Sequence, residues 1–90
     1  MKYKRRTDLK VQEVSGETLV LDQARDEVHH LNGTASFVWY LCDGTATITS
    51  IVERLVAAFD VSPEIAANDV AETIERLQEM RLIEEQAIRE

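Results

Sequence analysis

The chain has 90 residues, with ten Lys and Arg against seventeen Asp and Glu, and a net charge of −7 at pH 7. This length allows one small domain, and the 44% apolar share is typical of a folded one. The single cysteine, Cys42, excludes an internal disulfide and a cysteine-based metal site. The sequence contains no apolar run long enough for a membrane span and no secretory signal, so we expect a cytoplasmic protein that contacts no membrane.

The charges are unevenly distributed along the chain. Residues 1–10 carry five basic side chains and one acid, whereas residues 60–90 carry nine acids and three arginines. We therefore expect a basic N-terminal tail over residues 1–8, a single domain over 9–84, and an acidic C-terminal tail over 85–90. The overall acidity argues against general nucleic-acid binding, because such affinity depends on neutralising phosphates.

The first third of the chain is predicted to form three strands. Residues 9–14 are short and β-prone, residues 17–23 alternate between apolar and polar, and residues 27–31 form a third β-prone run. Ser15-Gly16 is a turn signal between the first two. Short connections of this kind predict an antiparallel meander, which needs a helical layer over its apolar face.

The rest of the chain is predicted to form three helices. Asn32 or Thr34 can cap an apolar helix over 35–42, and Thr47 can cap the second helix. The third helix begins at Ser62, followed by a proline in its first turn. The second helix has a regular apolar stripe, formed by Ile48, Ile51, Val52, Leu55, Val56 and Phe59. The stripe of the third helix is Ala66, Val70, Thr73, Ile74, Leu77 and Met80. Residues 81–84 either extend this helix or form a short closing segment.

These elements predict an α+β fold with a three-stranded antiparallel sheet followed by three helices. The arrangement is similar to a winged helix-turn-helix with its sheet placed first. A winged-helix DNA-binding or regulatory adaptor is therefore an alternative function. Only the basic arm over residues 2–6 favours it, because an arm of that kind can enter a minor groove. The third helix opposes it, since its acidic face lacks the phosphate contacts that position such a helix on DNA.

The sequence shows no constellation of catalytic or metal-binding residues. His29 and His30 are adjacent on a predicted strand and point to opposite faces, so they cannot chelate one ion together. Cys42 is expected to be an inert core thiol and Trp39 a core ring. We therefore predict no catalysis, no metal and no cofactor.

The third predicted strand has an open edge if the meander keeps its sequential order. An extended peptide can add as a strand to such an edge, with the third helix beside it as the second wall of a groove. Equally, the edge can be one that Glu27 and the two histidines merely protect with polar and charged side chains. The residues alone leave both interpretations open.

Residues 28–44 resemble the PqqD-like family. The shared pattern is a strand ending in Leu31-Asn32, a small-residue turn, an apolar helix containing Val38-Trp39, and a closing Asp43-Gly44. The pattern continues to the end of the predicted domain, through Thr47-Ile48, Ile51, Phe59 to Pro63, Asp69-Val70, Leu77 and Arg81 to Ile83. The resemblance thus covers about residues 9–84.

The resemblance implies a RiPP recognition element, a stand-alone chaperone for ribosomally made and later modified peptides. Such a protein captures the leader of a precursor peptide by β-strand addition and presents the precursor to a modifying enzyme, such as a radical SAM protein or a leader peptidase. The implied peptide-binding residues lie on the third strand and the third helix: Val28, His29, His30, Leu31, Asp69, Val70, Thr73, Arg76 and Leu77. Val70 and Leu77 can belong to the core instead. Acidic residues on this helix would suit Lys or Arg in a leader.

Overall fold

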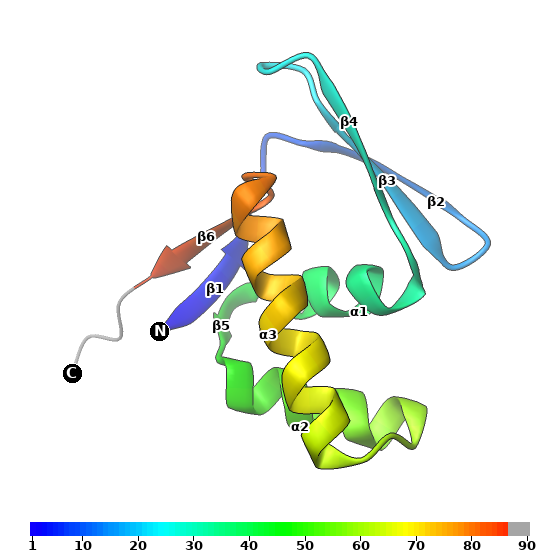
Figure 1. Ribbon diagram of the computed structural model, residues 1–90. Helices are drawn as coiled ribbons and strands as arrows, with labels where there is room; N and C mark the ends of the chain where they lie inside the picture. Colours follow the sequence, from blue (N-terminus) through cyan, green and yellow to red (C-terminus); the bar gives the residue numbers. More distant parts are fainter. Residues whose placement is uncertain (87–90) are drawn as a thin grey trace.

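A computed structural model describes residues 1–86 and shows two antiparallel sheets and three helices (Figure 1). The elements, in chain order, are β1 (Lys2–Arg5), β2 (Lys10–Val14), β3 (Glu17–Asp22), β4 (Glu27–Leu31), α1 (Gly33–Leu41), β5 (Asp43–Ala46), α2 (Ile48–Phe59), α3 (Pro63–Glu79) and β6 (Ile83–Gln86). The predicted α+β fold with an antiparallel sheet and three helices is confirmed. Its likeness to a winged helix stays a prediction.

The predicted meander forms the sheet β2-β3-β4, in sequential order. Ser15 and Gly16 connect β2 to β3, and both have positive φ (53° and 80°), as a two-residue type I′ turn requires. The register pairs Val14 with Glu17 beside this turn and Thr18 with Leu31 at the far end of β4. Thr18, Val20 and Asp22 are buried, so the alternate residues of β3 face the interior.

The expectation of a basic N-terminal tail over residues 1–8 is wrong, because β1 is the central strand of a second sheet, β5-β1-β6. Tyr3 is only 6% exposed and lies opposite Ala46 on one side and Glu85 on the other. A single buried aromatic ring thus anchors a strand whose other side chains are basic. The arm on which DNA binding depended is therefore part of a sheet.

The predicted C-terminal tail is also partly wrong, since residues 85 and 86 belong to β6. Residues 87–90 of that tail lie outside the described residues. Arg81 ends the preceding helical segment with a left-handed φ of 59°, and the Leu82 N–H donates to the Leu77 carbonyl oxygen (2.9 Å). Residues 81–84 therefore do not extend the helix but lead into the closing strand.

Each helix begins at a residue whose side chain caps it. Asn32 accepts a hydrogen bond from the Ala35 N–H (2.9 Å) at the start of α1. Thr47 and Ser50 cap α2 reciprocally, in a capping box. Ser62 accepts from the N–H of residue 65 at the start of α3. The starts of α2 and α3 confirm the predicted caps, and α1 uses Asn32 rather than Thr34.

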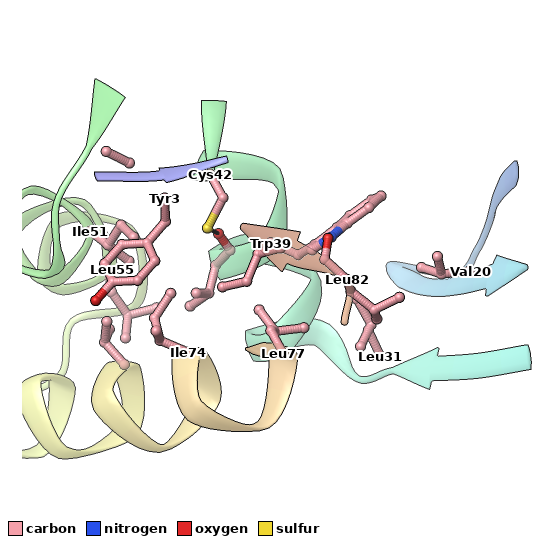
Figure 2. Close-up of a cluster of buried hydrophobic side chains, with 14 of the residues drawn as sticks. Tyr3, Val20, Leu31, Trp39, Cys42, Ile51, Leu55, Ile74, Leu77 and Leu82 are labelled. Atoms are coloured by element: carbon pink, nitrogen blue, oxygen red, sulfur yellow. Dashed lines mark hydrogen bonds between the residues drawn. The ribbon is translucent and has the colours of Figure 1, made fainter. Parts of the chain in front are cut away.

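The core lies around α1, between the two sheets and against α2 and α3 (Figures 1 and 2). Leu31 at the end of β4 packs close to Leu77 of α3 and Leu82 (Figure 2). The Trp39 indole Nε1–H donates to the Leu82 carbonyl oxygen (3.1 Å) in the interior. The core therefore fixes α3 against the end of β4, which positions the groove described below.

An ion pair connects the segment after β1 to the meander. The Arg6 guanidinium contacts the Asp22 carboxylate at 2.7 Å, and the Asp22 side chain is only 1% exposed. Arg6 also binds Asp8 and donates to the Arg81 carbonyl oxygen. The hydrogen bonds that Arg6 donates to the Asp22 carboxylate lower the pKa of Asp22 below its usual range. Arg6 thus joins elements from both sheets.

Candidate functional site

A groove lies between β4, the start of α1, and α3. Its volume is about 300 Å³. The lining side chains come from these three elements: His30, Leu31, Asn32, Thr34, Ala35, Asp69, Glu72, Thr73, Arg76, Leu77 and Met80. The groove runs beside the open edge of the meander, because β4 is an outer strand of its sheet among the described residues.

The turn between β2 and β3 determines which backbone groups of β4 face this open edge. A two-residue type I′ turn closes on a hydrogen-bonded pair, which here is Val14 and Glu17. Hydrogen-bonded and non-bonded pairs alternate along antiparallel strands. Glu17 and every second residue after it in β3 therefore bond β2, and the intervening residues of β3 bond β4.

The register of β3 and β4 then separates the residues of β4 into two sets. The residues of β4 opposite the intervening residues of β3 are Glu27, His29 and Leu31, and these bond β3. The remaining two, Val28 and His30, direct their N–H and C=O groups away from the sheet. This edge can therefore pair with one more strand through two residues, in the manner of an antiparallel or parallel ladder.

The side chains of β4 alternate between the two faces of the sheet. Val28 is 67% exposed, and the His30 imidazole contacts the Glu17 carboxylate at 2.7 Å on the outer face of the sheet. His29 is on the opposite face, half-buried, with its Nε2 at 3.7 Å from Glu27. The two histidines thus lie on opposite faces, as the sequence predicted.

The predicted residues of the third helix do not all reach the groove. Asp69, Thr73 and Arg76 line it from α3, and Leu77 lines its floor while belonging to the core. Val70 is completely buried and lies outside the groove lining. On β4, His30 and Leu31 are lining residues, whereas Val28 and His29 are not.

Sequence reasoning missed five lining residues: Asn32, Thr34, Ala35, Glu72 and Met80. Helical spacing could have predicted two of them. Glu72 lies three positions after Asp69 and Met80 lies four positions after Arg76, so each shares a helix face with a predicted residue. The other three lie where α1 starts, directly after β4. A short strand-to-helix connection brings such residues to the end of the strand they follow.

The groove combines an apolar floor with a charged rim. Leu31 and Leu77 are buried beneath the groove, and the partly exposed Ala35 and Met80 supply its apolar surface. The charged lining residues are Asp69, Glu72 and Arg76. The described part of the chain holds no cluster of three or more His, Cys, Asp or Glu side chains suited to a metal ion. Burial raises the pKa of the Cys42 thiol to about 12, so it is no nucleophile at neutral pH.

Three solved structures share this fold. The structure of TbiB1 in complex with the TbiA(beta) leader peptide matches with a TM-score of 0.80 and 19% identity, covering 94% of this chain and 99% of that one. Lasso peptide synthetase B1 complexed with its leader peptide matches with a TM-score of 0.79 and 19% identity, covering 94% and 100%. The PqqD truncation of PqqCD from Methylobacterium extorquens, described as a stand-alone RiPP recognition element, matches with a TM-score of 0.73 and 20% identity, covering 92% and 88%.

The sequence itself also matches a family profile. No curated protein matches the chain by sequence. The profile of the family described as coenzyme PQQ synthesis protein D (PqqD), however, matches residues 17–83, which extend from the start of β3 into β6 and include every residue of the groove. The suspected resemblance is confirmed: this chain belongs to the PqqD family.

Proposed function

We propose that this protein is a stand-alone chaperone that captures the leader of a ribosomally made precursor peptide and presents the precursor to a modifying enzyme. The observation that carries the proposal is the open edge of β4 beside a groove walled by α3. The winged-helix-like order, with the sheet first and an acidic third helix, then serves to bind a peptide rather than DNA.

The backbone of the leader supplies affinity in this proposal. Val28 and His30 offer outward N–H and C=O groups, so an extended leader segment adds as a fourth strand of the meander. Leader binding by main-chain hydrogen bonds also explains why the exposed Val28 belongs to the site without lining the groove.

The side chains of the groove supply specificity. Strand residues alternate between two faces, so every second leader residue points toward α3. An apolar leader residue suits the partly exposed Ala35 and Met80, and a Lys or Arg suits the carboxylates of Asp69 and Glu72. The leader we expect is therefore an extended segment with an apolar anchor and a nearby cation.

A chaperone without chemistry of its own needs a partner enzyme that modifies the precursor. Two of the similar structures contain bound leader peptides, and one of these proteins is a lasso peptide synthetase component. By analogy, the partner of this chain is a modifying enzyme such as a radical SAM protein or a leader peptidase. The groove lining contains no cysteine or serine, and we assign it no catalytic role.

The proposal is tested by an amide NMR titration with a synthetic peptide of the leader half of a precursor encoded beside this gene. Shifts are expected at residues 27–31 and on the groove-lining face of α3. Val28→Pro and His30→Pro each remove one outward N–H, which an edge strand tolerates, and should abolish binding. Val11→Pro is the matched control, because it removes an outward N–H from the opposite edge of the same sheet. Unchanged affinity in folded Val28→Pro and His30→Pro variants would contradict strand addition.

A further inference from the structure

The meander has a second open edge, formed by β2. No described segment within residues 1–86 pairs with its outer side, and all five of its residues are exposed. Val11 is 43% exposed and Val14 is 50% exposed, and β2 contains no proline or bulge in its pairing with β3. Proteins usually block such an edge, because it is a template for another strand.

The outward backbone groups of β2 are self-complementary. Lys10, Gln12 and Val14 bond β3, by the alternation that starts at the type I′ turn, so Val11 and Glu13 face outward. A two-fold axis at Gln12 places Val11 of one copy opposite Glu13 of the other. Both pairs then exchange two N–H to C=O hydrogen bonds, as in an antiparallel ladder.

One end of this edge is basic and the other end is acidic, which is the arrangement that an antiparallel pairing of two copies requires. A hollow with a net basic lining lies beside Val11: Lys4 and Arg5 outweigh the single carboxylate of Asp43, and Arg6, which also lines it, is paired with Asp8 and Asp22. The Arg5 guanidinium in this hollow lies 5.6 Å from the centre of the Trp39 ring. A second hollow lies at the other end of β2 and has acidic groups in its lining: Glu13 and Glu17.

The two-fold axis at Gln12 therefore brings the acidic end of each copy to the basic end of the other. Glu13, opposite Val11 of the second copy, reaches the basic hollow beside that Val11. Tyr40 of α1, which is exposed, lines both hollows. A parallel arrangement would place like charges together, and an uncharged strand would leave both hollows without a counter-charge.

We propose that a second copy of this chain binds along β2, forming a two-fold symmetric dimer with one continuous six-stranded sheet. The β4 edges then lie at the two outer ends of that sheet, and both grooves stay open. This inference goes beyond the proposed function and does not depend on it, because it concerns the opposite edge of the meander. Closed two-fold pairing is the commonest form of self-association in soluble proteins.

Sedimentation equilibrium of the full chain over a range of concentrations tests the dimer. We expect a species with twice the 10.2 kDa mass of one chain. Glu13→Lys, which places like charges in both basic hollows, should weaken dimerisation by at least about tenfold. Val11→Pro should weaken it by removing a ladder N–H, whereas His30→Pro on the other edge should leave it unchanged.

Circular dichroism of each variant confirms that it is folded before its mass is interpreted. A wild-type chain that stays monomeric at millimolar concentration overturns the proposal. A dimer that is insensitive to both Glu13→Lys and Val11→Pro also overturns it, because the contact must then lie elsewhere. Leader titration with the Glu13→Lys variant separates the two proposals: a monomeric variant that binds the leader as wild type does supports a β2 contact independent of the groove, and loss of leader binding contradicts that independence.

Discussion

Trp39 shows how a single side chain connects distant parts of this small core. Its ring is buried in α1, and its Nε1–H bonds the carbonyl oxygen of Leu82, 43 positions later in the chain. The Leu82 carbonyl precedes β6, so this hydrogen bond ties α1 to the strand that closes the second sheet. The same carbonyl oxygen also accepts from the Arg6 N–H (3.3 Å), so removing the indole donor costs one of its two hydrogen bonds.

We therefore predict that Trp39→Phe lowers the free energy of unfolding by roughly 1 kcal/mol, the typical net contribution of one hydrogen bond, because Arg6 still donates to the Leu82 carbonyl oxygen. Phenylalanine keeps an aromatic ring in the core and removes the donor. Urea unfolding followed by circular dichroism measures the change. Tyr40→Phe serves as the control, because Tyr40 is exposed and is expected to tolerate the loss of its hydroxyl. Equal stabilities of wild type and Trp39→Phe would show that the hydrogen bond contributes nothing.

At the scale of elements, α3 depends on Ser62, the residue that caps its start. Ser62 accepts a hydrogen bond from the Ile65 N–H, and Pro63 follows in the first turn. This cap satisfies a free N–H at the start of the helix, whereas the buried residues Val70, Ile74 and Leu77 hold the helix against the core. A weakened cap should therefore affect stability before it affects the groove.

Ser62→Ala is expected to lower the free energy of unfolding by about 1 kcal/mol, the typical value for loss of an N-cap. Ser62→Asn should retain wild-type stability, because asparagine caps equally well. Thermal or urea unfolding of the three proteins gives the comparison. If alanine and asparagine are equally destabilising, Ser62 acts through something other than its capping bond.

Helix starts were predictable from the sequence because a cap involves residues only three positions apart. Ser62 and Thr47 both illustrate this. The second sheet was not predictable, since β1 has one apolar residue, Tyr3, and pairs with residues some 40 and 80 positions away. Short-range patterns contain no information about such partners.

The groove was predicted in part, for related reasons. An open edge at β4 follows from the sequential order of a meander, and that order came from short turns. Predicting which residues of α3 line the groove required knowing how the helix is rotated about its axis. The spacing of apolar residues limits that rotation but does not determine it. Val70 was therefore assigned to both core and groove, and it lies only in the core.

At the scale of the whole molecule, Arg6 holds the two sheets together. It pairs with the buried Asp22 of the meander and with Asp8, and it donates to the Arg81 carbonyl oxygen beside the second sheet. The hydrogen bonds from Arg6 lower the pKa of Asp22 in the folded protein, so the folded state binds this proton less readily than the unfolded state does.

The stabilising effect of Asp22 should accordingly depend on pH. It is fully present above the pKa of an unfolded aspartate, about 3.9, and is lost as the pH falls through the lower folded pKa. We expect Asp22→Asn to be less stable than wild type at neutral pH and to lose less stability on acidification. Urea unfolding at a series of pH values measures this, with the exposed Asp26→Asn as control. Parallel pH profiles for wild type and Asp22→Asn would contradict the assignment.

The pairing of β1 with β6 also has a consequence for the order of folding. Lys2 lies opposite Gln86, so this ladder closes a loop that contains nearly the whole chain. Closing a long loop is entropically unfavourable and slow, whereas the β2-β3-β4 hairpins need contacts only a few residues apart. During synthesis the meander and α1 can assemble as they emerge. β1 can pair with β5 once residues 43–46 have emerged, but its other edge stays unpaired until β6 has left the ribosome.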